Sequence, residues 1–103
     1  MKKKAFPCPV CGRYEFEEEN DFDICGYCGW ENDGVQDNDH NYAGGANELS
    51  VNEARIEFFL INDEEKGRET KEIREEYLRK RKKGDAAKVR KEYLNKLNRL
   101  MND

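Results

Sequence analysis

The four cysteines of the chain form two pairs of identical spacing. The first pair is Cys8-Pro9-Val10-Cys11 and the second is Cys25-Gly26-Tyr27-Cys28, and a glycine follows each pair. Two C-x-x-C pairs can direct four thiolates to one tetrahedral ion. Pro9 suits the first position of such a turn, and Gly12 and Gly29 can adopt the positive φ that points backbone N–H groups at the sulfurs. The spacing therefore predicts a structural metal site formed by Cys8, Cys11, Cys25 and Cys28.

The four-thiolate ligand set also indicates which ion to expect. Zn(II) is the expected ion, and Fe is the alternative, because the same tetrahedral sulfur set holds iron in rubredoxin-like electron carriers. Four sulfurs occupy all four positions of a tetrahedral ion and leave no place for water or substrate. We therefore expect one structural metal and no enzyme activity.

The composition explains why a metal would be needed. Of 103 residues, 41% are charged and only 36% are hydrophobic, so side chains alone would form a small core. Lys2-Lys3-Lys4 is basic like the start of an export signal, but no apolar run follows it, and no stretch of about 18 apolar residues could span a membrane. A cytoplasmic protein is expected, and in that reducing compartment paired cysteines are more often metal ligands than disulfides.

The segment between the two cysteine pairs has the pattern of a β-hairpin. Residues 13–17 and 21–25 each alternate polar with apolar side chains, and Glu18-Glu19-Asn20 between them can turn the chain. Trp30, next to the second pair, is expected to cover the metal site. The apolar face of this hairpin is predicted to consist of Tyr14, Phe16, Phe22 and Ile24.

A longer pattern joins the cysteine pairs to the residues that follow them. It runs through Cys8-Pro9-x-Cys11-Gly12, Asp23-Ile24-Cys25-x-x-Cys28-x-Trp30-Glu31-x-Asp33, Gln36, Gly44-Gly45-x-Asn47 and Ser50-x-x-Glu53-Ala54-Arg55. Over about residues 6–60 this string resembles the bacterial cysteine-rich CPCC family. The family's motif has a third cysteine where this chain has Val10, which removes support for a redox role and leaves the four ligands in place. The resemblance implies a small zinc-ribbon or rubredoxin-like fold and, because some members lie in toxin–immunity gene neighbourhoods, an immunity or antitoxin-type role.

Helices are expected after the second cysteine pair. Residues 31–47, rich in Asn, Asp and Gly, predict a long loop, and Ser50-Val51-Asn52-Glu53 is a capping box that starts a helix. Gly67 and Gly84 divide the rest into helices over residues 68–83 and 85 to about 101. The predicted fold is small α+β. Residues 1–63 form a zinc-ribbon or rubredoxin-like hairpin module with a capped helix, and residues 64–103 form a charged helical extension, expected to be a helical hairpin.

The two predicted parts carry opposite charge. Residues 1–63 contain five Lys/Arg and fourteen Asp/Glu, whereas residues 64–103 contain fourteen and nine. An acidic surface can meet a basic protein partner, such as a toxin or nuclease, because complementary charge speeds association. We therefore predict a non-catalytic zinc-binding protein that acts by protein–protein interaction. The candidate partner-binding residues are Glu17, Glu18, Glu19, Asp37 and Asp39.

A basic run near the C-terminus supports an alternative function. Lysine and arginine side chains in a row can contact the phosphates of nucleic acid. A solvated helix end explains such a run equally well, because cations are favoured at the negative end of the helix dipole. The candidate nucleic-acid-binding residues are Arg79, Lys80, Arg81, Lys82 and Lys83.

Overall fold

The computed structural model describes residues 6–102, and these form two compact units. The first unit ends at Phe58 and the second begins at Phe59, so the boundary lies within helix α2 (Val51–Ile61). The basic segment Lys2-Lys3-Lys4 lies outside the described residues. None of the helices in residues 6–102 combines the length and apolar character needed to cross a bilayer.

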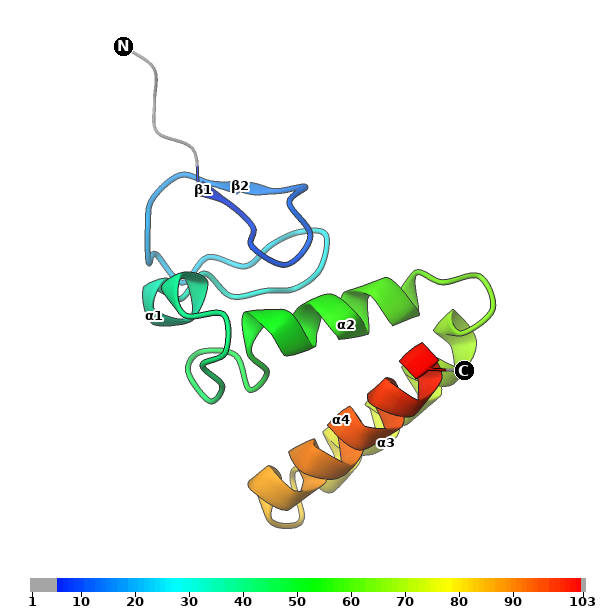
Figure 1. Cartoon of the computed structure of the whole chain (residues 1–103). Helices are drawn as coiled ribbons and strands as arrows, with labels where there is room; N and C mark the ends of the chain where they lie inside the picture. The colour runs from blue at the N-terminus through cyan, green and yellow to red at the C-terminus, as the bar shows by residue number, and fades with distance from the viewer. Residues whose placement is uncertain (1–5, 103) are drawn as a thin grey trace. The chain divides into compact units, whose positions relative to one another are not determined.

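The first unit begins with a two-stranded antiparallel sheet around the first cysteine pair (Figure 1). Strand β1 (Phe6–Pro7) pairs with strand β2 (Glu15–Phe16), with Phe6 opposite Phe16. The backbone N–H of Cys8 donates to the carbonyl of Tyr14 at 2.8 Å and extends the pairing to the first cysteine. The first C-x-x-C turn therefore lies between two paired segments.

The second cysteine pair has its own short pairing. Ile24 and Glu31 form an isolated antiparallel bridge, and the N–H of Cys25 donates to the carbonyl of Trp30 at 2.8 Å. The predicted hairpin between residues 13–17 and 21–25 is therefore wrong. Each C-x-x-C turn reverses the chain by itself, so the segments on its two sides pair with each other.

Backbone conformation also breaks the second predicted strand. Asn20 and Phe22 both have positive φ, at 59° and 58°, which is incompatible with an extended strand. Phe22 and Ile24 point away from the core, with 52% and 58% of their surface exposed. The alternation of residues 21–25 thus does not mark a buried face.

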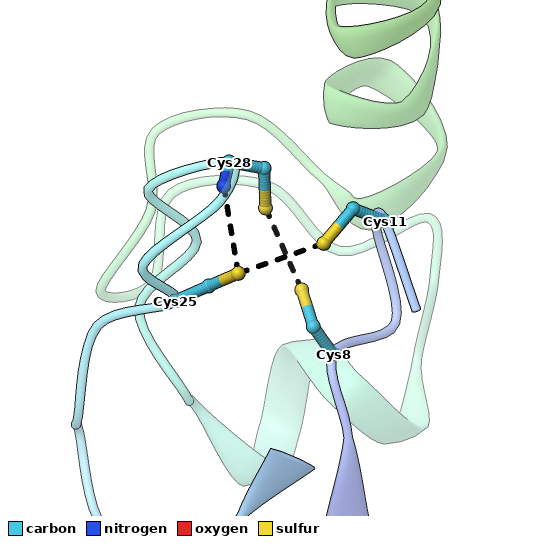
Figure 2. Close-up of side chains that lie close together, drawn as sticks. All are labelled: Cys8, Cys11, Cys25 and Cys28. Carbon is cyan, nitrogen blue, oxygen red and sulfur yellow. Dashed lines mark hydrogen bonds between the residues drawn. The ribbon is translucent and has the colours of Figure 1, made fainter. Parts of the chain in front are cut away.

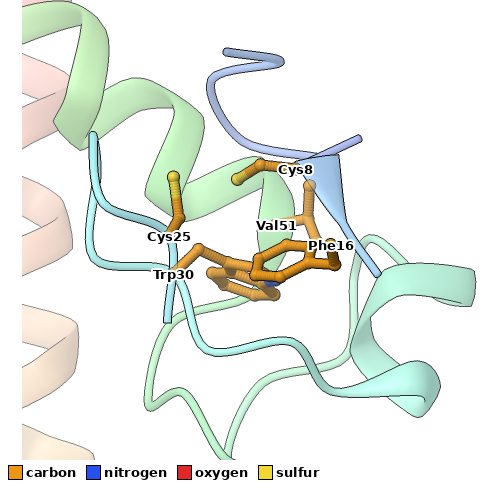
Figure 3. Close-up of a cluster of buried hydrophobic side chains, with 5 residues drawn as sticks. All are labelled: Cys8, Phe16, Cys25, Trp30 and Val51. Atoms are coloured by element: carbon orange, nitrogen blue, oxygen red, sulfur yellow. The ribbon is translucent and has the colours of Figure 1, made fainter. Parts of the chain in front are cut away.

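The core of the first unit lies directly against the cysteines (Figure 3). Trp30 is only 3% exposed and packs in this cluster, which confirms the expectation that it is buried against the cysteine site. Tyr14 packs edge-on against Phe16, with ring centroids 5.1 Å apart. The buried members of the cluster are Cys8, Phe16, Cys25, Trp30 and Val51.

The segment predicted as a long loop contains a short helix, α1 (Gly34–Asn38). Asp33 caps it, because its Oδ1 accepts from the N–H of Val35 at 2.9 Å and of Gln36 at 3.4 Å. Its Oδ2 accepts from the N–H of Ala46 at 2.9 Å. One carboxylate thus starts the helix and holds the returning chain.

Buried amide side chains hold the rest of this segment. Gln36 is fully buried, and its Nε2 donates to the carbonyls of Tyr42, Asn47 and Leu49 at 3.1, 3.0 and 3.2 Å. Asn47 pairs with the backbone of Glu31 in both directions, at 2.9 and 2.8 Å. The segment is ordered because these side chains satisfy backbone groups that no helix or sheet pairs.

Helix α2 begins at the predicted capping box. The N–H of Glu53 donates to Ser50 Oγ at 3.2 Å, and the N–H of Ser50 donates to Glu53 Oε1 at 2.8 Å. This reciprocal pair satisfies two of the N–H groups that a helix start leaves unpaired. The prediction of a capped helix after residue 50 is confirmed.

The second unit contains two packed helices, α3 (Gly67–Lys80) and α4 (Ala86–Asn102) (Figure 1). The rings of Tyr77 and Tyr93 stack at 4.4 Å with an angle of 5° between their planes. The expected helices are present, but α3 ends at Lys80, three residues earlier than predicted. The core of this unit consists of Leu60, Thr70, Tyr77, Tyr93, Leu97 and Leu100.

Candidate metal centre

The four cysteine sulfurs converge on one point (Figure 2). All four Sγ atoms lie within 4.8 Å of one another, and the distance is 3.5 Å both from Cys8 to Cys28 and from Cys11 to Cys25. A disulfide requires an S–S distance of about 2.05 Å, so these close pairs join cysteines that are not bonded. Both close pairs connect one C-x-x-C turn with the other.

The two turns have the same backbone geometry. Gly12 N–H donates to Cys8 O at 2.9 Å, and Gly29 N–H donates to Cys25 O at 3.0 Å. Both glycines have positive φ, at 69° and 82°, which other residues adopt only with strain. The repeated C-x-x-C-G sequence therefore encodes two equivalent turns, each presenting two sulfurs.

Backbone N–H groups point at the sulfurs, as the sequence predicts. Cys25 Sγ accepts from the N–H groups of Tyr27 and Cys28, both at 3.4 Å, and Cys11 Sγ accepts from Arg13 N–H at 3.5 Å. Such donors stabilise negative charge on sulfur. The turns thus favour the thiolate form that metal binding requires.

The clustered cysteines affect one another's ionisation. The hydrogen bond between the Cys8 and Cys28 sulfurs lowers the pKa of Cys8 to about 5 and raises the pKa of Cys28. Burial raises the pKa of Cys11. A cation at the centre of the cluster would take the place of protons held between sulfurs and lower the pKa of every ligand.

Each turn buries one cysteine and leaves the other closer to the surface. Cys8 and Cys25, the first members of the two pairs, are each 2% exposed, whereas Cys11 and Cys28 are partly exposed. Trp30 lies with the buried cysteines in the core cluster (Figure 3). The site therefore has a dry inner side and an outer side through which an ion can enter.

The cluster has the dimensions of a tetrahedral thiolate site. With metal–sulfur bonds of about 2.3 Å, adjacent sulfurs of a tetrahedron are about 3.8 Å apart. The close pairs at 3.5 Å and the outer limit of 4.8 Å bracket this value. The four cysteines are thus positioned to hold a metal ion. Among the His, Cys, Asp and Glu side chains of residues 6–102, these four cysteines are the ones that cluster closely enough to do so.

The acidic candidate residues lie outside this cluster. Glu17, Glu18, Glu19 and Asp39 are exposed. Asp37 is partly buried, and its Oδ1 accepts a hydrogen bond of 2.9 Å from the indole Nε1 of Trp30. Asp37 therefore has a structural contact that its sequence position did not predict.

The basic candidate residues lie where α3 ends. Arg79 and Lys80 close the helix, and Arg81, Lys82 and Lys83 lie in the turn that follows. Lys80 forms an ion pair of 2.7 Å with Glu76, and this pair raises the pKa of Lys80. One of the five candidates is thus partly neutralised by a neighbour.

Sequence reasoning missed the polar residues that support the site. Asp33, Gln36 and Asn47 fix the segment after Trp30, and Arg55 Nε donates to Pro9 O at 2.7 Å, tying α2 to the first turn. The spacing Asp33-x-x-Gln36 is a signal for a helix start, because Asp is a preferred N-cap. The contact of Arg55 joins residues 46 positions apart and has no local signal.

Comparison with known proteins identifies one family. The family model described as cysteine-rich CPCC matches residues 6–78, which include the four cysteines, α1, α2 and most of α3. No curated protein matches the chain.

Proposed function

The chain belongs to the cysteine-rich CPCC family, and from this membership and its sulfur cluster we propose that it is a zinc-binding protein of the zinc-ribbon type. One Zn(II) would be held by Cys8, Cys11, Cys25 and Cys28. Thiolate sulfur is a preferred ligand of zinc, and a four-sulfur shell is typical of structural sites. The observation that carries this proposal is the convergence of all four sulfurs within 4.8 Å.

The metal would hold the first unit together. Its apolar core is small, and two of its five buried residues, Cys8 and Cys25, are themselves candidate ligands. In zinc-finger peptides such a site contributes about 10–16 kcal/mol of apparent folding free energy. The fold of the first unit would then depend on the ion.

Metal analysis of cysteine variants tests this proposal. We expect one zinc per chain in the purified protein, and loss of zinc and of the folded first unit in Cys11→Ser and Cys28→Ser. Ser50 lies outside the cluster, and its Ser50→Ala variant should keep the metal. A red protein that contains iron would identify a rubredoxin-like site, and an unchanged melting curve in the cysteine variants would exclude a structural metal.

We propose further that the protein acts by binding and has no catalytic activity. Four protein sulfurs would complete the shell of a tetrahedral ion, so the metal would have no position for substrate. The binding surface would be the acidic segment Glu17–Glu19, exposed between the two cysteine turns, together with Asp39. A basic protein surface, such as that of a nuclease toxin, would be the complementary partner of an immunity-type protein.

Exposed apolar residues beside the acidic segment support a contact surface. Phe22, Ile24 and Tyr27 are 52%, 58% and 63% exposed and flank Cys25 on both sides. Phe22 keeps a positive φ of 58°, which is uncommon for a bulky residue and places an aromatic side chain on the surface. Protein interfaces combine apolar anchors of this kind with a charged rim.

Charge-neutral variants test the binding surface. Zinc-loaded protein would be used to capture partners from a lysate treated with nuclease, and the affinity of the recovered partner would be measured. Glu17→Gln/Glu18→Gln/Glu19→Gln should weaken a basic partner and keep zinc, whereas Glu64→Gln/Glu72→Gln/Glu75→Gln changes the net charge equally on exposed residues of the second unit. If both variants bound the partner with equal affinity, the acidic segment Glu17–Glu19 would not be part of the binding surface.

A further inference from the structure

The turn between α3 and α4 collects basic side chains from both helices. We define the basic tip as residues 79–91, which contain eight Lys/Arg and one Asp. The C-terminal end of α3 and the first turns of α4 lie next to each other here (Figure 1). The structure therefore adds the exposed Lys88 and Lys91 to the run of five basic residues seen in the sequence, whereas Arg90 is half-buried. The whole tip lies outside residues 6–78, the region matched by the family model.

Helix stability explains only part of this charge. Arg79 and Lys80 lie in the last turn of α3, where the helix dipole favours cations. Lys88 lies in the first turn of α4, which has no acidic residue and where a cation is disfavoured. Asp85 is already engaged, since its Oδ1 accepts from the N–H groups of Ala87 and Lys88 at 3.0 and 3.4 Å. The positive charge of Lys88 therefore lies at the positive end of the α4 dipole, where it does not stabilise the helix.

Four exposed lysines of the tip have no carboxylate partner within residues 6–102. Glu76 pairs with Lys80 at 2.7 Å and with Lys96 at 3.4 Å, so Lys80 is the member of the tip that this carboxylate neutralises. In the described part of the chain, Lys82, Lys83, Lys88 and Lys91 are exposed and take part in no ion pair. Their field is therefore directed at solvent and at any anion that approaches.

We propose that the basic tip binds the phosphate backbone of double-stranded nucleic acid. The tip offers positive charge but lacks the exposed apolar side chains that bind membranes and the exposed aromatic rings that stack on unpaired bases. Membrane-binding helices combine basic residues with exposed apolar ones, and the large apolar residues exposed among residues 6–102 all lie elsewhere. The nearest aromatic rings, Tyr77 and Tyr93, are buried against each other and unavailable for stacking on bases.

This assignment predicts binding without base readout and does not rest on the proposed zinc or protein-binding functions. Contacts made only to phosphate position a protein but carry no sequence information. The affinity should lie in the non-specific range of about 10⁻⁴ to 10⁻⁶ M and fall steeply with salt, because counterions are released.

A matched pair of charge variants tests the proposal on the full, metal-loaded chain. Binding to a short labelled DNA duplex and to an RNA duplex would be followed by anisotropy between about 50 and 200 mM salt. Lys83→Gln/Lys88→Gln/Lys91→Gln should weaken binding at least tenfold and reduce the salt slope by about 2 to 3. Arg68→Gln/Lys71→Gln/Arg99→Gln, with the same net charge at the opposite ends of α3 and α4, should keep both the affinity and the slope.

Three outcomes would overturn the proposal. They are undetectable duplex binding at the lowest salt, an equal loss in both variants, and binding to vesicles of anionic lipid with none to either duplex. Unchanged helical circular dichroism in both variants would show that the comparison concerns charge and not folding.

Discussion

The indole Nε1 of Trp30 donates a hydrogen bond of 2.9 Å to Asp37 Oδ1, which joins the core beside the cysteines to helix α1. Trp30 is 3% exposed and its ring packs with Cys8 and Cys25. Burial raises the pKa of Asp37, and the nearby Asp33 carboxylate acts in the same direction. An acidic side chain therefore serves here as a hydrogen-bond acceptor for a buried ring.

Asp37→Ala should destabilise the first unit by about 1–3 kcal/mol, because the buried indole N–H loses its acceptor. Asp37→Asn keeps an acceptor oxygen and should cost far less. Thermal unfolding followed by tryptophan fluorescence, at constant zinc, measures the difference. Equal losses in the two variants would show that charge, and not the hydrogen bond, is what matters.

Asp37 should also make the stability of the first unit depend on pH. A carboxyl group whose pKa is raised on folding disfavours the fold once it ionises, and this penalty vanishes below the ordinary carboxyl pKa. The stability of Asp37→Asn relative to the unsubstituted protein should therefore rise as pH increases through the raised pKa of Asp37 and then level off. Denaturant unfolding of both proteins over a pH series checks this, and a difference that shrinks as pH rises would contradict it.

Gln36→Ala should be strongly destabilising, by about 3 kcal/mol. The Gln36 side chain donates to three backbone carbonyls and accepts from Asn47 N–H at 3.0 Å, and alanine leaves these groups without partners in a buried position. Val35→Ala is the control, since Val35 lies in the same helix and is 61% exposed. Its effect on the unfolding midpoint should stay within about 0.5 kcal/mol.

Two glycines of the second unit should respond differently to alanine. A Cβ at Gly67 would lie 2.5 Å from the carbonyl oxygen of Ile61, so Gly67→Ala should cost about 1–3 kcal/mol. At Gly84 the nearest atom, Lys80 O, is 3.9 Å away, and Gly84→Ala should be neutral or slightly stabilising. Helical circular dichroism during heating compares the variants, and equal melting temperatures would show that the backbone near Ile61 adjusts freely.

Removal of the metal should affect the two units differently. A chelator should abolish the fixed environment of Trp30, because the cysteines form part of its core. The helical signal from α3 and α4 should largely persist, since the core around Tyr77, Tyr93 and Leu97 contains no ligand. Near- and far-ultraviolet circular dichroism of the intact chain report on these separately, and a single joint loss of both signals would show that the units do not fold independently.

The sequence alone was enough to predict the cysteine turns, the start of α2 and the two C-terminal helices. The two C-x-x-C-G turns, the capping box of Ser50 and Glu53 and the helices after Gly67 and Gly84 each depend on residues within a few positions of one another. For the same reason the four cysteines could be identified as candidate ligands before their sulfurs were known to meet. Capping, turn geometry and helical periodicity act over one or two turns of chain.

Tertiary structure decided which segments pair and which side chains are buried. The alternation of residues 21–25 predicted a strand against residues 13–17, yet each segment pairs across its own cysteine turn, and Phe22 and Ile24 remain exposed. Asn, Asp and Gly between residues 31 and 47 predicted a long loop, whereas the structure has a short helix there and buries Gln36, whose side chain donates to the backbone carbonyls of Tyr42 and Leu49. Strand partners and the burial of polar groups depend on contacts between residues far apart in sequence, and the alternation of side chains along one segment does not specify them.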